Sequence, residues 1–535
     1  MLILSFEARQ EARSRYYEQG TQAFHERRWN DAILAYTEAL NLGEDPNLLT
    51  NLGAIYQQNW KLPKAVELYR RALELDAAHP EARGNLANAC LDMLEPEQAL
   101  EHKRMSLAFQ LMKGKSADSL QSHVELVFAL TTLAPYHAYT AEMRQLCEHH
   151  LAHMYPTKDW QAGPVPADRK IRLGYISADF NRHTVMVLLE PLFNAYNADR
   201  FELHCYYNGT INDDMTARLR SATHFRDIVG MTDKRARHVI VADQLDLLVD
   251  LTGYSSGQRL SLLARKPAPR IATGLGFIAP IGCPSIDYAL LDPAMVSDEQ
   301  DQAGHVPENI ARIPTNMFYR PEPELELKTP ERTGVVFGSA NSLFKVNQTV
   351  IECWAHILRM VPGSILRLKA KALSDPEVLS IARAKFAAHG IDPARVEGSG
   401  QATRREYMSW YHGVDICLDP FPYQGGVTSS EALYMGCPVI ALDAAGINTT
   451  VSILQAADMG EYVTRSPEEY VRQAVQLGMV VATLGPEKRL GMRQHIRRQI
   501  QKSIIFDAGH FASSIEQAYE AMCELPAKPR PRRTR

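Results

Sequence analysis

The 535-residue sequence lacks the features that mark several broad classes of protein. It has no apolar run long enough to cross a bilayer, and its first residues turn acidic too soon for a secretory signal peptide, so we expect neither a membrane partner nor export. Its eight cysteines include no Cys-x-x-Cys pair, which predicts reduced, buried thiols in a cytoplasmic protein rather than a disulfide framework. A net charge of −4 gives no general attraction to nucleic acid.

The sequence is also poor in patterns that bind metals. No Asp-x-Asp motif stands at the end of a predicted strand, and Asp213 and Asp214 are expected to cap a helix instead. His149, His150 and His153 are close in sequence, but their spacing is that of the exposed face of a helix. We therefore predict no metal site and no metal cofactor.

Small and aromatic residues recur through the first hundred positions. The small residues Gly20, Gly53 and Ala87 follow one another at steps of 33 and 34, and Tyr36 and Tyr69 keep the same step, whereas Lys103 takes the third aromatic position. This is the period of tetratricopeptide repeats, whose stacked helix pairs build a concave surface. The repeats predict a groove for a protein or peptide; a packing or homo-oligomerisation module is the alternative.

The pattern changes after a Pro- and Gly-rich linker at 156–168. Short apolar runs then alternate with helical stretches, which is typical of a parallel sheet covered by helices, and a second Pro-rich stretch at 307–330 separates two such series. We predict helical repeats and a cap at 1–155, Rossmann-like domains at 169–320 and 331–523, and a basic, disordered tail at 524–535. Ligands of such sheets bind beyond the carboxyl ends of the strands.

The segment 418–438 is the most informative strand end. An apolar strand ends in Asp-Pro, Gly425 and Gly426 follow, and Thr428 opens a short helix. Glycines let backbone N–H groups approach a ligand, and a helix N-terminus favours an anion, so the segment predicts a phosphate-binding site. Glu431, one turn further on, is placed to bind a ribose hydroxyl. An ordinary strand–turn–helix is the alternative.

Two other strand ends carry candidate residues. His183 follows the strand at 171–177 and could act as a general base or hold a phosphate; the alternative is a helix cap at this place, with Asn181 or Thr184 as the capping residue. Lys345 lies between a strand and a helix, where its ammonium could reach a diphosphate, although a lone lysine there is also typical of a plain surface position.

These motifs together resemble the O-GlcNAc transferase/SPINDLY family of nucleotide-sugar-dependent protein glycosyltransferases. The resemblance rests on five segments in the family's order, namely 171–183, 247–254, 265–269, 337–345 and 418–428, with tetratricopeptide repeats before them. It implies a GT-B fold, with two Rossmann-like domains and the donor bound mainly by the second.

The resemblance also implies roles for individual residues. His183 matches the family's active-site histidine, and Lys345 matches the lysine that neutralises the donor diphosphate as the nucleotide leaves. Tyr407, with Arg405 beside it, falls where the family places a side chain on the nucleobase.

The donor loop both matches the family and departs from it. Gly425, Gly426, Val427 and Thr428 fall on the family's phosphate loop and Glu431 on its ribose-binding carboxylate, but Val427 lacks the usual hydroxyl and Glu431 replaces an aspartate. A family arginine after the loop is replaced near Thr450. These departures concern the sugar and the acceptor more than the diphosphate.

The sequence supports two functions of different kinds. The first is an inverting glycosyltransferase that moves a sugar, GlcNAc or else fucose, from a nucleotide diphosphate sugar to Ser or Thr of a protein without a metal. The second is a tetratricopeptide scaffold whose transferase body is degenerate; the changes at Val427 and Thr450 motivate it. Retained donor affinity would distinguish them.

Overall fold

The computed structural model describes residues 6–525 except 115, 157–159, 161–162, 298–300, 303–305, 321–324, 331–332 and 445. The chain divides into two compact units, each formed by two separate stretches: residues 1–129 with 336–407, and residues 130–335 with 408–535. We describe each unit by itself. The predicted disordered tail lies almost wholly outside the described residues, and the predicted domain boundaries stay predictions.

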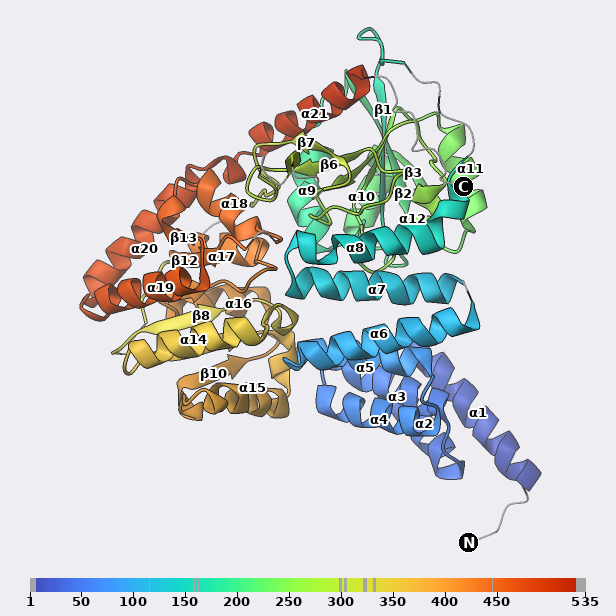
Figure 1. Ribbon diagram of the computed structural model, residues 1–535, viewed down its shortest axis with the longest axis horizontal. Helices are drawn as coiled ribbons and strands as arrows, with labels where there is room; N and C mark the ends of the chain where they lie inside the picture. Colours follow the sequence, from blue (N-terminus) through green and yellow to red (C-terminus); the bar gives the residue numbers. More distant parts are fainter. Residues whose placement is uncertain are drawn as a thin grey trace. The chain divides into compact units, whose positions relative to one another are not determined.

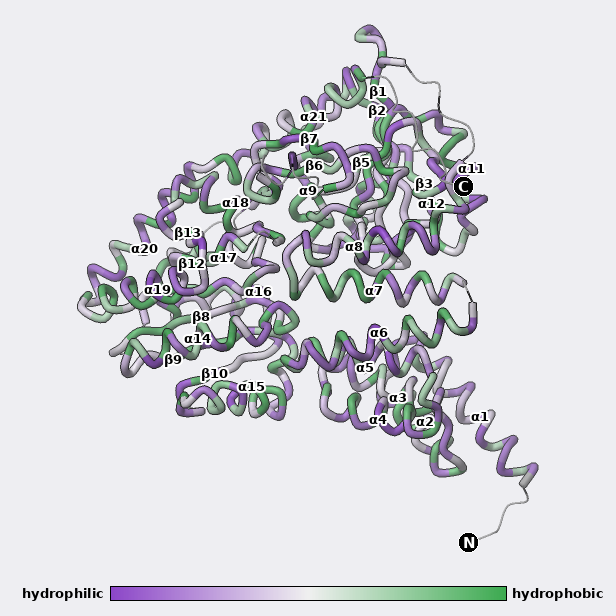
Figure 2. The backbone as a smooth tube through the Cα atoms, in the orientation of Figure 1, coloured by the Kyte–Doolittle hydropathy of each residue, from purple (hydrophilic) through white to green (hydrophobic). Residues whose placement is uncertain are grey.

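The first unit begins with antiparallel helix pairs (Figure 1). The helices are α1 (Phe6–His25), α2 (Trp29–Leu42), α3 (Pro46–Gln58), α4 (Leu62–Leu75), α5 (Pro80–Asp92), α6 (Pro96–Lys113) and α7 (Ala117–Leu133). Hydrophilic and hydrophobic residues alternate along them (Figure 2), as in helices that bury one face. Arg27, Trp60 and Leu94, in the turns inside the three pairs, have φ of 58°, 58° and 63°, so the backbone repeats with the predicted period.

The small and aromatic positions of the repeats pack against each other as predicted. A Cβ placed on Gly20 would lie 2.6 Å from the ring of Tyr36, and one on Gly53 would lie 2.6 Å from the ring of Tyr69. Both tyrosines are buried. Each ring occupies the space that a side chain on the facing helix would fill. This packing explains why glycine and tyrosine recur together.

The first unit also contains one half of the second Rossmann-like domain. Its strands are β8 (Val336–Ser339), β9 (Ile365–Lys369) and β10 (Val396–Ser399), and its helices are α14 (Gln348–Met360), α15 (Pro376–Ala388) and α16 (Arg404–Trp410). The three strands pair in parallel, in register from Val336 with Ile365 and from Leu366 with Val396. The helices α14 and α15 are capped by Asn347 and Asp375, whose side chains accept hydrogen bonds from amides of the first turn.

The second unit holds the first Rossmann-like domain. Its parallel sheet has the order β3-β2-β1-β4-β5-β6-β7. The strands are β1 (Ile171–Ser177), β2 (Phe201–Tyr207), β3 (His224–Asp227), β4 (Leu247–Asp250), β5 (Ile271–Gly274), β6 (Tyr288–Leu291) and β7 (Asn309–Arg312), and the helices between them are α9 (Thr184–Asn194), α10 (Asp214–Ala222), α11 (Asp233–Ala242) and α12 (Leu260–Ala264). The strand predicted at 171–177 is confirmed with the same bounds as β1, which is buried at six of its seven positions, as in a strand covered on both faces.

The remaining elements of the second unit lie on either side of this domain in sequence. Before it come α8 (Tyr136–Leu146) and a π-helical turn at Cys147–Leu151. After it come the strands β11 (Ile416–Leu418), β12 (Val439–Leu442) and β13 (Val463–Thr464) and the helices α17 (Val427–Tyr434), α18 (Thr449–Ala456), α19 (Pro467–Ala482), α20 (Pro486–Gln501) and α21 (Ala508–Glu524). Within this unit the three strands pair in parallel in the order β11-β12-β13. The last helix returns to the first sheet, where the Tyr519 hydroxyl accepts a buried hydrogen bond of 3.2 Å from the Tyr175 hydroxyl.

Three predictions about single residues can be checked here. Asp213 caps α10 and accepts from the amide of Thr216, as predicted. The prediction that His149, His150 and His153 form one exposed face is wrong for His150, which is buried within the π-helical turn. All eight cysteines are free and buried, as predicted. Among the described residues, no helix is long and apolar enough to span a membrane.

Candidate active site

The predicted phosphate loop connects β11 to α17 in the second unit. Asp419, at the end of β11, is buried, and its carboxylate accepts from the amide of Gly425 at 3.1 and 3.2 Å. A Cβ on Gly425 would lie 2.4 Å from Oγ of Ser429 and 2.6 Å from Oγ1 of Thr428. The loop therefore requires glycine at 425 for close packing and not for an unusual φ.

Helix α18 holds the same loop from its other side. The carbonyl oxygen of Gly425 accepts from the hydroxyls of Thr449 and Thr450, the latter at 3.0 Å. The Thr450 hydroxyl also lies 2.8 Å from Oγ of Ser429. Gln424 is buried, accepts from the amide of Val451 at 3.0 Å and donates to the carbonyl of Leu442 at 2.6 Å. These bonds fix the loop before any ligand binds, which is the condition for strong electrostatic stabilisation.

The loop leads directly into the N-terminus of α17. Gly426 is the N-cap residue and gives no side-chain cap, and Gly426, Val427 and Thr428 are half-buried. The first turn of a helix has amides without an intrahelical acceptor and a partial positive charge, so it suits an anion. Val427 can present its amide here as well as a threonine could. Glu431 is only 2% exposed, so the carboxylate predicted for ribose is an interior group of this helix.

The first unit contains a cavity of about 380 Å³ at the carboxyl ends of its three strands. Ala340, Ala370 and Gly400, each the residue after a strand, line it together with Tyr407. This is the end of a parallel α/β sheet at which ligands bind. Tyr407 thus lies in a cavity, as the prediction for a nucleobase-stacking residue requires.

Two cations lie against the ring of Tyr407. Nζ of Lys369 is 5.8 Å and Cζ of Arg404 is 5.6 Å from the ring centroid. Lys369 is buried and donates to the carbonyl of Gly400 at 3.1 Å, and burial lowers the pKa of its ammonium. Arg405, the arginine predicted beside the tyrosine, is exposed and is not among the residues that line the cavity.

The helical repeats contribute to the same cavity. Trp60, from the turn between α3 and α4, and Asp92, at the end of α5, both line it. Desolvation raises the pKa of Asp92 from 3.8 to about 7. Sequence reasoning missed both residues, because in a repeat alignment they are ordinary turn and helix-end positions.

Lys345 ends a short 3-10 turn between β8 and α14. Its amide donates to the carbonyl of Ser342 at 3.1 Å, and the residue is half-buried. Ser342 and Leu343 of the same turn line the cavity of the first unit. The turn follows the carboxyl end of a strand, so the predicted location of Lys345 at a ligand-binding edge is consistent with the fold.

His183 is the N-cap residue of α9, so the prediction of Asn181 or Thr184 as the cap is wrong. Its Nδ1 accepts from the amide of Val185 at 3.4 Å and lies 3.7 Å from Oδ2 of Asp179. Capping needs an unprotonated Nδ1, whereas pairing with Asp179 needs Nδ1–H and frees Nε2 to accept a proton. Both contacts are long and the imidazole is 49% exposed, so a ligand can select the tautomer.

Comparison with known proteins identifies the family of this chain. The model of glycosyl transferase family 41 matches residues 102–322 and 324–515. The chain belongs to this family. It is 31% identical over 69% of its length to the probable UDP-N-acetylglucosamine–peptide N-acetylglucosaminyltransferase SPINDLY of Solanum lycopersicum. It is 26% identical over 67% of its length to the probable transferase SEC of Arabidopsis thaliana. The chain spans 40% of the tomato protein and 37% of the Arabidopsis one.

A solved structure supports the same assignment. A lysine-to-methionine mutant of the Thermobaculum terrenum O-GlcNAc transferase matches 98% of this family-41 chain with a TM-score of 0.86 and 28% identity, and 99% of that chain is covered. The predicted resemblance is confirmed, and so is the predicted fold class: helical repeats followed by the two Rossmann-like domains of a GT-B fold. The roles of individual site residues stay predictions.

Proposed function

We propose that this family-41 chain transfers a sugar from a nucleotide diphosphate sugar to a serine or threonine hydroxyl of a protein. The observation that carries the proposal is the glycine loop before α17, which Asp419 and Thr450 brace from two sides. A loop fixed by buried bonds, with a helix N-terminus behind it, is suited to a diphosphate. A tetratricopeptide scaffold that has lost transferase activity would not require such a preformed phosphate-binding site.

The chemistry follows from the charges that the reaction creates. As the bond from the sugar to the diphosphate breaks, negative charge grows on the leaving phosphate, and the α17 N-terminus stabilises it. For Lys345 the family resemblance is the support: it matches the lysine that neutralises the leaving diphosphate. His183, with Asp179 beside Nδ1, accepts the proton of the attacking hydroxyl through Nε2. Attack opposite the leaving group inverts the anomeric carbon. Because fixed protein charges offset the phosphates, the proposed reaction uses no metal.

We further propose UDP-GlcNAc as donor and a peptide held by the repeats as acceptor. The names of the matched SPINDLY and SEC proteins support this donor. The cavity with Tyr407 supports a flat base as part of the ligand, since an aromatic ring and two cations face one another there. GDP-fucose is the second donor to be tested, because nothing in the loop itself distinguishes the two sugars.

Calorimetric titration tests the proposal directly. The purified chain is titrated with UDP, GDP, UDP-GlcNAc and GDP-fucose, next to Lys345→Ala and a matched control, Lys488→Ala, whose lysine is exposed on α20. We expect saturable binding of one base, weakened in Lys345→Ala and unchanged in the control. With the bound donor radiolabelled in the sugar, Lys345→Ala should transfer label to protein about 10²- to 10³-fold more slowly. Absence of binding by all four ligands would instead indicate a scaffold.

A further inference from the structure

A second polar cluster lies in the first sheet of the second unit, on strands β2 and β3. Glu202 and His204 are two residues apart on β2, so their side chains leave the same face of the sheet. His204 pairs in register with His224 on β3, the edge strand. Three potential metal ligands therefore meet on one face at the sheet's edge.

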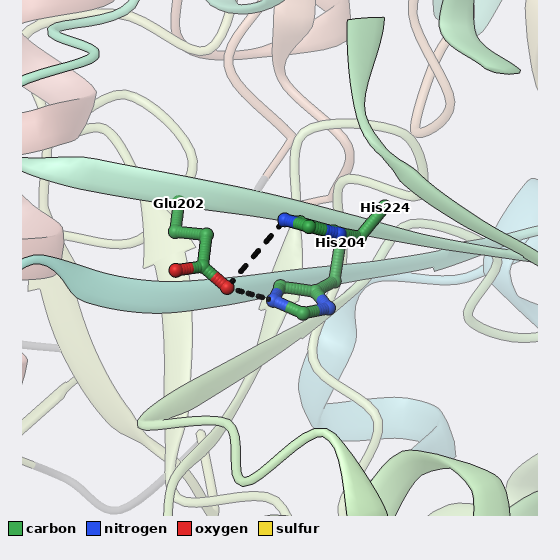
Figure 3. A group of neighbouring side chains, drawn as sticks. All are labelled: Glu202, His204 and His224. Atoms are coloured by element: carbon green, nitrogen blue, oxygen red, sulfur yellow. Dashed lines mark hydrogen bonds and ion pairs between the residues drawn. The ribbon is translucent and has the colours of Figure 1, made fainter. Parts of the chain in front are cut away.

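Their donor atoms converge (Figure 3). Nε2 of His204 lies 2.9 Å and Nε2 of His224 lies 3.6 Å from the same carboxylate oxygen, Oε1 of Glu202. One ligand atom from each residue lies within 4.8 Å of the others. The two imidazoles stack with centroids 4.6 Å apart. Among the described residues, no other group of three such side chains is this compact.

The surroundings of His204 orient its ring for a ligand at Nε2. Its Nδ1 is buried and makes no hydrogen bond in the described structure, and the carboxylate of Asp243 lies 3.8 Å from it. Asp243 is itself held by the hydroxyl of Tyr206 at 2.8 Å and by Arg226 at 3.2 Å. A carboxylate behind the distal nitrogen of a histidine is the usual outer partner of a metal-bound imidazole.

We propose that Glu202, His204 and His224 bind a divalent transition-metal ion of the zinc type, a property separate from the proposed sugar transfer. Two imidazoles and one carboxylate suit Zn²⁺ or Co²⁺, whereas Mg²⁺ and Ca²⁺ prefer oxygen ligands alone. Three protein ligands leave one tetrahedral position for water, because His224 is 57% exposed. The ion would join the edge strand β3 to β2.

The test uses the full chain without an affinity tag, stripped with EDTA and dialysed. ZnCl₂ is titrated calorimetrically, and Co²⁺ binding is followed by its visible absorption, which reports tetrahedral coordination. We expect one Zn²⁺ per chain and at least tenfold weaker binding by His224→Ala, whose side chain is mainly exposed, and by Glu202→Gln, which keeps the side-chain shape. His238→Ala, which removes an exposed histidine on α11, should bind like the wild type.

Two outcomes would overturn the proposal. One is a wild-type chain that binds neither Zn²⁺ nor Co²⁺. The other is a site whose stoichiometry and affinity are unchanged in both His224→Ala and Glu202→Gln, with circular dichroism showing that both variants are folded. In either case the cluster would be a polar contact between a carboxylate and two histidines, without a metal. Nucleotide binding, measured in the same samples, reports separately on the proposed transferase function.

Discussion

Replacing Gly425 by alanine should damage the donor loop without unfolding the chain. The new methyl group would lie 2.4 Å from Ser429 Oγ, 2.6 Å from Thr428 Oγ1 and 2.8 Å from Asp419 Oδ1. These atoms cannot all withdraw, because Ser429 also meets Thr450 and Asp419 also holds the Gly425 amide. The loop must move instead, and with it the amides at the start of α17.

The size of the effect follows from the cost of overpacking. Forcing one extra methyl group into a packed site costs about 1–3 kcal/mol. If the ligand must restore the original loop in order to bind, this cost appears in its affinity, since every 1.4 kcal/mol is about tenfold. We therefore expect the dissociation constant of the nucleotide to rise by about 5- to 150-fold.

Calorimetric titration measures this constant, and Gly491→Ala is the matched control. Gly491 lies within α20, where a Cβ would have no atom within 4 Å, so alanine should leave binding unchanged and raise the melting temperature slightly. Nucleotide affinity of folded Gly425→Ala within twofold of the wild type would refute the argument that this loop seats the diphosphate.

Three other changes have defined outcomes. His183→Ala should lower the rate of transfer by about 10²- to 10⁴-fold in a single-turnover assay while nucleotide affinity survives; an unchanged rate would remove His183 from the reaction. Asp92→Asn should flatten the pH dependence of nucleotide affinity. Desolvation raises the pKa of the Asp92 carboxyl to about 7, so this group ionises between pH 6 and 8 and then repels the anionic ligand. A wild-type affinity that does not vary between pH 6 and 8 would exclude this role for Asp92. Burial raises the pKa of Glu308 from 4.5 to about 7, so the folded chain holds this proton more tightly than the unfolded chain and loses stability as the pH rises from 4.5 to 7. In denaturant melts the free energy of unfolding of Glu308→Gln should match that of the wild type at pH 4.5 and exceed it at pH 8 by up to about 3 kcal/mol. Equal gains at both pH values would contradict the assignment.

The sequence predicted those elements whose residues satisfy one strong local rule. The strands β1 and β2 are rich in apolar residues and are buried at six of seven positions, and the loop at Gly425 and Gly426 combines a strand end, two glycines and a helix start. It did not predict β3, because three of the four residues of this edge strand, all but Phe225, are exposed, so the strand shows no apolar run. With β3 missing, the pairing of His204 with His224 could not be anticipated.

The candidate site was predicted in the same uneven way. Lys345 could be placed between a strand and a helix by its position after an apolar run, whereas Tyr407 was predicted only through the family resemblance. Lys369 could not, because it is the last residue of β9 and its sequence context gives no sign that its ammonium reaches the Gly400 carbonyl. Asp92 lies more than 240 residues before the strands whose ends it faces, so only the fold shows that the repeats line this cavity.

The third repeat shows how a departure from a pattern can be a coordinated change. Lys103 occupies the place of Tyr36 and Tyr69, and Ala87 occupies the place of the glycines that face those rings, sixteen residues earlier in each case. A Cβ at Gly20 or Gly53 would lie 2.6 Å from the facing tyrosine ring, so a tyrosine placed in the same way at 103 would clash with the Ala87 methyl group.

The slender lysine stem is compatible with that methyl group, and its buried ammonium is satisfied by Glu125 at 2.6 Å and Asn88 at 2.8 Å. Glu125 lies on α7, beyond the three predicted repeats, so this substitution ties the last repeat to the helix that follows it. In the sequence, the missing aromatic residue weakens the third repeat. In the structure, the lysine in its place joins the repeat array to the next helix.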